Sequence, residues 1–193
     1  KTGKNQFLEY RYVMKENDHM LEFSIRTQGL ENVLNTSKPS DLEWNLKTYR
    51  NEKSVSYENR YTEIIYEHED GKDSYLSNVS DDDETIEEVS YVAFKQHFFT
   101  SVLLTNTPFK TAELKSDNLV DDEKIDTVFT KNFTAKMPLE FKNGALNYDM
   151  NMYYGPTDYK TLSAYDKHLD ELVSLGWGIF GWINMFVFIP LFG

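Results

Sequence analysis

Apolar and polar residues alternate with a period of two along much of the first 155 residues. A strand whose every second residue is apolar turns one face toward a core and the other toward water. The pattern occurs in five stretches, namely Leu8–Met14, Leu21–Ile25, Leu42–Leu46, Val55–Tyr66 and Leu146–Tyr154. Strands at this density, separated by polar turns, predict an antiparallel sandwich.

The stretch Tyr91–Leu104 differs because its apolar residues fall on both faces. A strand that is buried on both sides has this pattern, so we expect the central strand here, broken or bulged near Lys95–His97, where polar residues interrupt it. Acidic runs at Glu67–Asp70 and Asp81–Glu88 predict exposed loops, as does the composition of residues 111–124.

The pattern changes at Gly155-Pro156, where apolar residues begin to recur at helical spacing. Proline suits the first turn of a helix, and Gly176 can end the helix in a left-handed cap. We therefore expect three parts: a sandwich over residues 1–155, an amphipathic helix packed on it over residues 156–175, and a separate segment over residues 176–193.

The last nineteen residues, Leu175–Gly193, carry no charged side chain. A membrane-spanning helix, a core or oligomer contact and a helix lying in the membrane interface are the three interpretations. Four glycine and proline residues and the short length disfavour a span, while tryptophan suits the headgroup region. The interfacial interpretation assigns membrane contact to Trp177, Ile179, Phe180, Trp182, Ile183, Phe186 and Ile189.

Composition narrows the possible partners. The net charge of −12 argues against nucleic acid, which requires clustered Lys and Arg. The absence of cysteine excludes disulfides, thiol catalysis and thiolate metal sites. Residues 1–15 lack the apolar region of a signal peptide, so either the chain is cytoplasmic or an upstream segment is missing.

Motifs for catalysis and cofactors are weak. Residues 176–181 match G-x-G-x-x-G, but no strand precedes them and the chain ends twelve residues later, so we interpret the match as spurious. No histidine pair has zinc-ligand spacing. His97 is a candidate catalytic base, although a hydrogen-bonded structural histidine is the favoured interpretation. We expect no metal and no cofactor.

Three groups of residues carry a resemblance to a known family. They are Tyr91–Leu104 (YVAFKQHFFTSVLL), Tyr153–Pro156 and Leu175–Phe192, with Trp44–Lys47, Glu52–Ser54 and Tyr57–Asn59 agreeing in order and spacing. The chain resembles the YidC membrane protein insertases of Gram-negative bacteria, and most closely those of Bacteroidetes type. It departs from the family at Tyr91, where tryptophan is frequent, and at Gly181 and Met185, where a basic residue is expected.

The resemblance implies a fold and a location. It implies the large periplasmic loop between the first two transmembrane helices, folded as a β-supersandwich of galactose mutarotase-like type with C-terminal α-helices. The N-terminal part of the sandwich is then expected to be missing, and residues 177–192 are expected to lie on the periplasmic surface of the inner membrane ahead of an absent span.

The implied function is a non-catalytic periplasmic domain of an insertase and chaperone for inner-membrane proteins, acting with or without the Sec translocon. Expected partners are the lipid surface, Sec components (SecYEG, SecDF) and nascent membrane proteins. The alternative is a saccharide-binding or mutarotase-like domain, which rests on fold analogy alone. A surface lipoprotein or adhesin module is a third interpretation, which assigns no role to the uncharged segment.

Overall fold

The computed structural model of the chain describes residues 5–69, 71–126, 128–173, 186 and 191. The chain divides into two compact units, unit 1 with residues 1–155 and unit 2 with residues 156–193.

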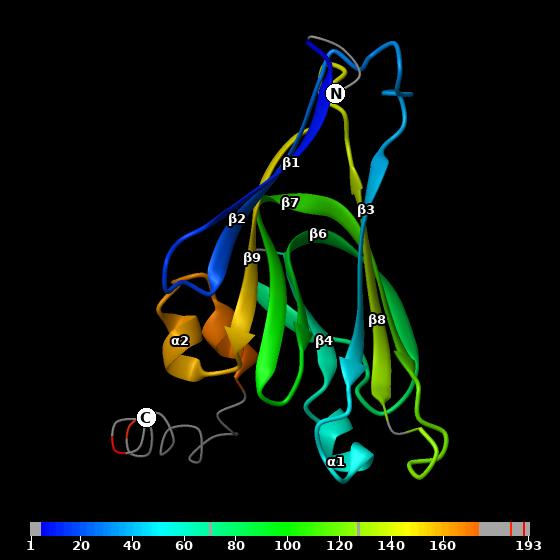
Figure 1. Cartoon of the computed structure of the whole chain (residues 1–193), viewed down its shortest axis with the longest axis vertical. Helices are drawn as coiled ribbons and strands as arrows, with labels where there is room; N and C mark the ends of the chain where they lie inside the picture. The colour runs from blue at the N-terminus through cyan, green and yellow to red at the C-terminus, as the bar shows by residue number, and fades with distance from the viewer. Residues whose placement is uncertain (1–4, 70, 127, 174–185, 187–190, 192–193) are drawn as a thin grey trace. The chain divides into compact units, whose positions relative to one another are not determined.

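The described residues of unit 1 form nine antiparallel strands (Figure 1). Seven of them follow the order β1-β2-β9-β7-β6-β4-β5, while β8 pairs with β7 and β3 pairs with β8. Their bounds are β1 Phe7–Met14, β2 Met20–Gln28, β3 Ser40–Tyr49, β4 Glu63–His68, β5 Lys72–Tyr75, β6 Asp82–Lys95, β7 Phe99–Asn118, β8 Phe129–Leu139 and β9 Asn147–Pro156. The prediction of a mainly β, antiparallel fold is confirmed.

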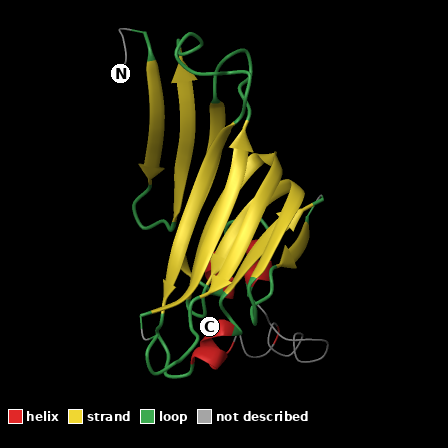
Figure 2. Cartoon of the chain, turned by 90° about the vertical axis from the view of Figure 1, so that its right-hand side faces the viewer, coloured by secondary structure: helices red, strands yellow, loops and turns green. Residues whose placement is uncertain are grey.

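The long strands β6 and β7 belong to both layers of this unit. The end of β6 pairs with the start of β7 and with β4, and the start of β6 pairs with a part of β7 whose other edge carries β8. The register shifts between Val89 and Tyr91, as expected where a bulge bends a strand. Figure 2 shows the long strands running side by side.

The core lies where the layers meet. Trp44 in β3 stacks on Phe94 in β6 with ring centroids 4.0 Å apart, although these strands are not neighbours in the sheet. Phe94 also contacts Phe133 of β8 at 5.3 Å. Side chains from both layers are fully buried here, including Leu103, Leu114 and Met137. The sheet therefore folds over itself and forms a sandwich.

The prediction of a strand over Val55–Tyr61 is wrong. Val55–Asn59 forms the short helix α1, and the Ser54 hydroxyl accepts the backbone N–H of Tyr57 as an N-cap. A serine that satisfies one of the free N–H groups at a helix start favours a helix over a strand. The apolar alternation in this stretch therefore did not indicate a strand.

The expected central strand Tyr91–Leu104 is two strands. It forms the turn of the β6–β7 hairpin, in which Lys95 lies opposite Thr100. Both arms are buried, as the two-faced apolar pattern predicts. The loops expected at Asp81–Glu88 and residues 111–124 are also largely wrong, because Asp82–Glu88 lies in β6 and β7 continues to Asn118. Most of these acidic side chains stay exposed on the strands. Their carboxylates therefore keep their contact with water, and placing them in a strand costs little free energy of desolvation.

Unit 2 does not contain the expected continuous helix over residues 156–175. Its described part has an α-helix, α2 (Tyr159–Ser163), and a 3₁₀ helix, η1 (Leu169–Leu172). Asp158 is the N-cap of α2, and its carboxylate accepts the Thr161 N–H at 2.8 Å. Asp166 and His168 adopt positive φ angles of 50° and 58° between the two helices, and such angles cannot continue a right-handed helix. Leu162, Leu169 and Leu172 are buried.

Candidate functional sites

The residues predicted to contact a membrane lie almost entirely outside the described part of the chain. Trp177, Ile179, Phe180, Trp182, Ile183 and Ile189 are among the residues that the structure does not describe. Phe186 is described, and its side chain is exposed. No helix within the described residues is long and apolar enough to cross a membrane.

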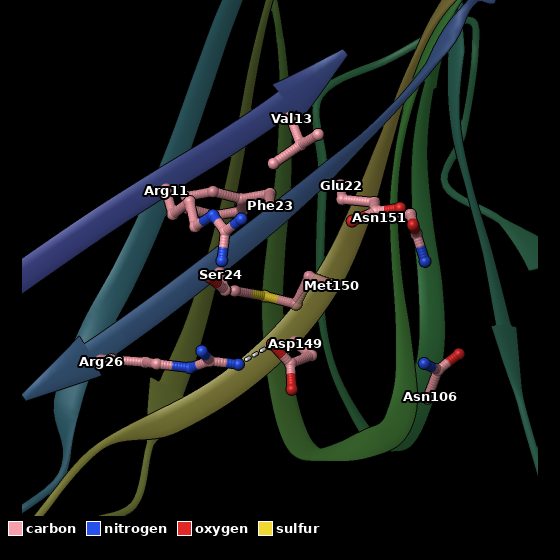
Figure 3. A pocket seen from close by; sticks show the side chains of 10 residues that line it. All are labelled: Arg11, Val13, Glu22, Phe23, Ser24, Arg26, Asn106, Asp149, Met150 and Asn151. Carbon is pink, nitrogen blue, oxygen red and sulfur yellow. Dashed lines mark hydrogen bonds and ion pairs between the residues drawn. The ribbon is translucent and has the colours of Figure 1, made fainter. Parts of the chain in front are cut away.

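A polar cleft of about 360 Å³ lies over strands β1, β2 and β9 (Figure 3). Antiparallel pairing places Arg11 opposite Ser24, and Ser24 opposite Asp149, so their side chains share one face of the sheet. The lining is completed by Val13, Glu22, Phe23, Arg26, Asn106, Met150 and Asn151. The cleft is thus built on three neighbouring strands, with exposed side chains such as Arg11 and Asp149 beside the buried side chains of Phe23 and Met150.

One ion pair joins two residues that line the cleft. Arg26 donates to Asp149 through a 2.7 Å ion pair and to Asn147 at 3.1 Å. His97, the candidate base of the mutarotase-like alternative, is not among the residues that line the cleft. General acid–base catalysis needs a proton-transferring group within reach of the substrate, and the cleft therefore does not use the candidate that the sequence suggested.

His97 instead belongs to an aromatic cluster between α1 and the β6–β7 turn. Its ring stacks on Tyr61 at 4.3 Å and on Phe98 at 4.2 Å, and Tyr57 meets it edge-on at 5.7 Å. Its Nδ1 forms a hydrogen bond with the Glu52 carboxylate. Hydrogen bonding with the Tyr61 side chain raises the pKa of Tyr57. These contacts favour the interpretation of His97 as a hydrogen-bonded structural residue. Its partner Glu52 could not be recognised from the sequence, because the two residues lie far apart along the chain.

Two lysines of the sandwich, Lys95 and Lys131, have buried side chains. Lys95 forms a 2.9 Å ion pair with Glu63, and both side chains are almost completely shielded. Lys131 donates to the backbone carbonyl of Asn78 at 2.9 Å. Burial lowers the pKa of Lys131 to about 8, although the negative charges of Glu63 and Asp81 act in the opposite direction and raise it. Among the described residues, no group of three His, Asp or Glu side chains could hold a metal ion.

The motif Tyr153–Pro156 has a packing explanation. A Cβ atom on Gly155 would lie 2.5 Å from the Tyr153 hydroxyl oxygen and 3.0 Å from Cγ of His19. These separations are shorter than van der Waals contact, so only glycine fits. The motif therefore positions the end of β9, where the chain leaves unit 1.

The fold and its sites define a class: a β-sandwich domain with a polar cleft whose lining omits the predicted base, followed by an uncharged aromatic segment. The sequence matches the family described as the YidC periplasmic domain over residues 1–190. The chain belongs to this family.

Curated relatives agree. The chain is 31% identical to the membrane protein insertase YidC of Bacteroides fragilis over 195 residues, which cover 96% of this chain and 31% of that protein. It is 30% identical to YidC of Parabacteroides distasonis over 201 residues, covering 99% of the chain and 31% of the relative. The YidC of Porphyromonas gingivalis is 32% identical over 197 residues, covering 95% and 31%. The chain spans about a third of the length of these relatives, which are named as insertases and not as enzymes.

Proposed function

We propose that this chain is the periplasmic domain of an inner-membrane insertase and assists the insertion and folding of membrane proteins there. The family match over residues 1–190 carries the proposal. The uncharged Leu175–Gly193 segment supports it, because it gives an otherwise acidic domain a part suited to the membrane surface.

Residues 177–192 act as the interfacial element of this domain. The domain then has three parts in chain order. They are the sandwich of residues 1–155, the helical residues 156–175, and the surface segment of residues 176–193. Trp177 and Trp182 suit the headgroup region, and each large apolar side chain that leaves water contributes roughly 1.5–3 kcal/mol. A few such side chains are enough to hold the segment on lipid.

The domain acts without catalysis, as a surface for partners. The absence of His97 from the cleft lining supports this role, as does the Arg26–Asp149 ion pair inside the cleft. Its partners are the lipid surface, nascent membrane proteins and Sec translocon components (SecYEG, SecDF). The names of the relatives support the membrane-protein clients.

Flotation with vesicles of phosphatidylethanolamine and phosphatidylglycerol tests the interfacial role. We expect the 193-residue chain to float and a chain ending at Gly176 to stay at the bottom of the gradient. The matched control is Tyr10→Ser, which removes an exposed aromatic side chain from the sandwich and leaves residues 177–192 intact. Equal flotation of the full and shortened chains would contradict the proposal, provided that circular dichroism shows both to be folded.

A further inference from the structure

The β6–β7 turn lies in the longest uncharged stretch of the first 174 residues. Residues 96–109 (QHFFTSVLLTNTPF) contain no Lys, Arg, Asp or Glu, although charged residues make up 27% of the chain. The strand portions of this stretch are mostly buried in the core, but the turn is not. Phe98 and Phe99 are 57% and 64% exposed at its tip.

Two adjacent phenylalanines on a hairpin tip are costly to leave in water. Tyr57, on the neighbouring helix α1, adds a third exposed ring, which meets the ring of Tyr61 at 5.3 Å. We define these three exposed side chains, Tyr57, Phe98 and Phe99, as the aromatic tip. Tyrosine carries an apolar ring and a polar hydroxyl, which suits the boundary between lipid headgroups and acyl chains.

The aromatic tip is held in place by contacts beneath it. The backbone N–H of Gln96 donates to the Phe99 carbonyl at 2.9 Å and closes the turn. The ring of His97 stacks on Tyr61 and on Phe98. Its Nδ1 forms a hydrogen bond with the Glu52 carboxylate, so this charged group has a partner within the protein. Fixed side chains lose little conformational entropy when they bind.

The loop that leads into α1 is fixed as well. Arg50 donates to the backbone carbonyls of Glu52 at 3.1 Å and Lys53 at 2.6 Å. The buried carboxylate of Glu58 accepts the N–H groups of Asn51 and Glu52 at 2.9 and 3.2 Å. Tyr57 is therefore presented from a braced loop and not from a free one.

The tip lies at the end of unit 1 from which the chain continues toward the uncharged segment. Figure 1 shows the β6–β7 turn and α1 at the same end of this unit as the end of β9. Tyr153, near the end of β9, pairs with Met20 at the start of β2. The other end of β2, at Gln28, therefore lies at the opposite end of the unit. The loop after β2, which contains Val33, lies at that opposite end.

We propose that the aromatic tip is a second lipid-contact site, in which Phe98, Phe99 and Tyr57 enter the headgroup–acyl boundary of the bilayer. The inference rests on the proposed function, since the segment that follows β9 would bring this end of the sandwich to the membrane. Two separated contacts fix the orientation of a domain on a surface, whereas a single contact leaves it free to swing.

Single-cysteine labelling tests the site directly, because the chain has no cysteine of its own. Phe98→Cys and the control Val33→Cys each carry an environment-sensitive fluorophore, at positions whose natural side chains are similarly exposed at 57% and 59%. With phosphatidylethanolamine–phosphatidylglycerol vesicles, we expect a blue shift at position 98 that spin-labelled lipid quenches, and no response at position 33.

A pair of double variants measures the contribution to binding. Phe98→Ser with Phe99→Ser should lower the vesicle partition coefficient about tenfold, as expected when partly buried rings are lost. Val33→Ser with Leu34→Ser should change it less than about twofold, because these apolar side chains remain in water. Thermal unfolding of each variant checks that the sandwich is intact.

The outcomes separate the inference from the proposed function. If the unmodified chain binds vesicles while the label at position 98 stays in water, the lipid-contact site is wrong and the proposed function stands. If the unmodified chain does not bind vesicles, both are wrong. A label at position 98 that responds to protein concentration without lipid would indicate contact between copies, which also contradicts the inference.

Discussion

The β6–β7 hairpin and the β1 edge both carry apolar residues at every second position of one face, yet their burial is opposite. Val92, Phe94 and Leu103 of the β6–β7 hairpin are buried at 0–1% exposure. Tyr10, Tyr12 and Met14 of β1 alternate just as regularly, yet they are 56%, 60% and 71% exposed. Alternation decides which face a side chain takes, and the neighbouring elements decide whether that face is covered.

Charged pairs show the same contrast. Glu63 and Lys95 face each other across the β4–β6 pair with side chains only 12% and 8% exposed. Glu69 and Lys72 form a comparable 2.8 Å pair on the surface, more than 60% exposed. Equal distances therefore describe interactions of very different weight, because solvent screens the second pair.

The largest expected effect is in the centre. Phe94→Ala removes a ring that stacks on Trp44 and contacts Phe133, so we expect the free energy of unfolding to fall by about 3–5 kcal/mol. Urea denaturation followed by circular dichroism measures it. A loss below about 1 kcal/mol would show that the two layers do not share this core.

Removing one member of the buried ion pair comes next. Glu63→Gln leaves the Lys95 ammonium shielded and without its counter-charge, at a cost of about 3–5 kcal/mol. The matched control Glu69→Gln breaks the exposed pair with Lys72 and should cost less than about 1 kcal/mol. Similar losses for the two variants would contradict the contrast in burial.

A smaller effect depends on pH through Lys131. Its folded pKa of about 8 lies below that of an unfolded lysine, about 10.4, so the unfolded chain binds more protons between these values. The free energy of unfolding therefore rises as the pH increases between these two pKa values, and the added stability is lost when the pH falls again. Between about pH 7 and about pH 9.5, the original chain should gain about 2 kcal/mol relative to Lys131→Met. Parallel curves for the two proteins in urea denaturation would show that Lys131 is not desolvated.

The smallest expected change is at the edge. Tyr10→Ser replaces an exposed side chain of β1, and we expect the free energy of unfolding to change by less than about 0.5 kcal/mol. The same urea denaturation measures it. A loss that approaches that of Phe94→Ala would mean that β1 is covered as the centre is.

Much of the fold could be predicted from the sequence. Regular alternation identified β1, β2, β3, β4 and β9, and the two-faced pattern of Tyr91–Leu104 located the centre. The polar residues Lys95–His97 located the interruption of this stretch, but they did not reveal that the chain reverses there as a hairpin, because both arms are buried. Helix α1 was missed because a single Ser54 cap outweighs the alternation that follows.

Strand β8 shows a further limit. Phe133, Ala135, Met137 and Leu139 alternate and are all buried, so the signal was present. Buried Lys131 and the strand residue Pro138 obscure it, because lysine usually indicates solvent and proline usually indicates the end of a strand. Contacts between distant residues, such as Glu52 with His97, depend on the three-dimensional fold and have no local signal.

Of the two candidate membrane contacts, one could be recognised from the sequence and the other could not. The uncharged segment was visible as composition, and its predicted residues stay a prediction. The aromatic tip was not recognised from sequence, because Phe98 and Phe99 resemble core residues until the turn exposes them. The uncharged run over residues 96–109 was the available signal.

The three tryptophans provide the most direct test of whether this domain lies on a membrane through its last residues. Trp44 stacks on Phe94 in the sandwich, whereas Trp177 and Trp182 belong to the uncharged segment. Trp44→Phe leaves the two segment tryptophans as fluorophores, and Trp177→Phe with Trp182→Phe leaves Trp44 alone. On vesicles that contain brominated lipid, we expect strong quenching of the first variant and none of the second. Unquenched emission from Trp177 and Trp182 would contradict this expectation.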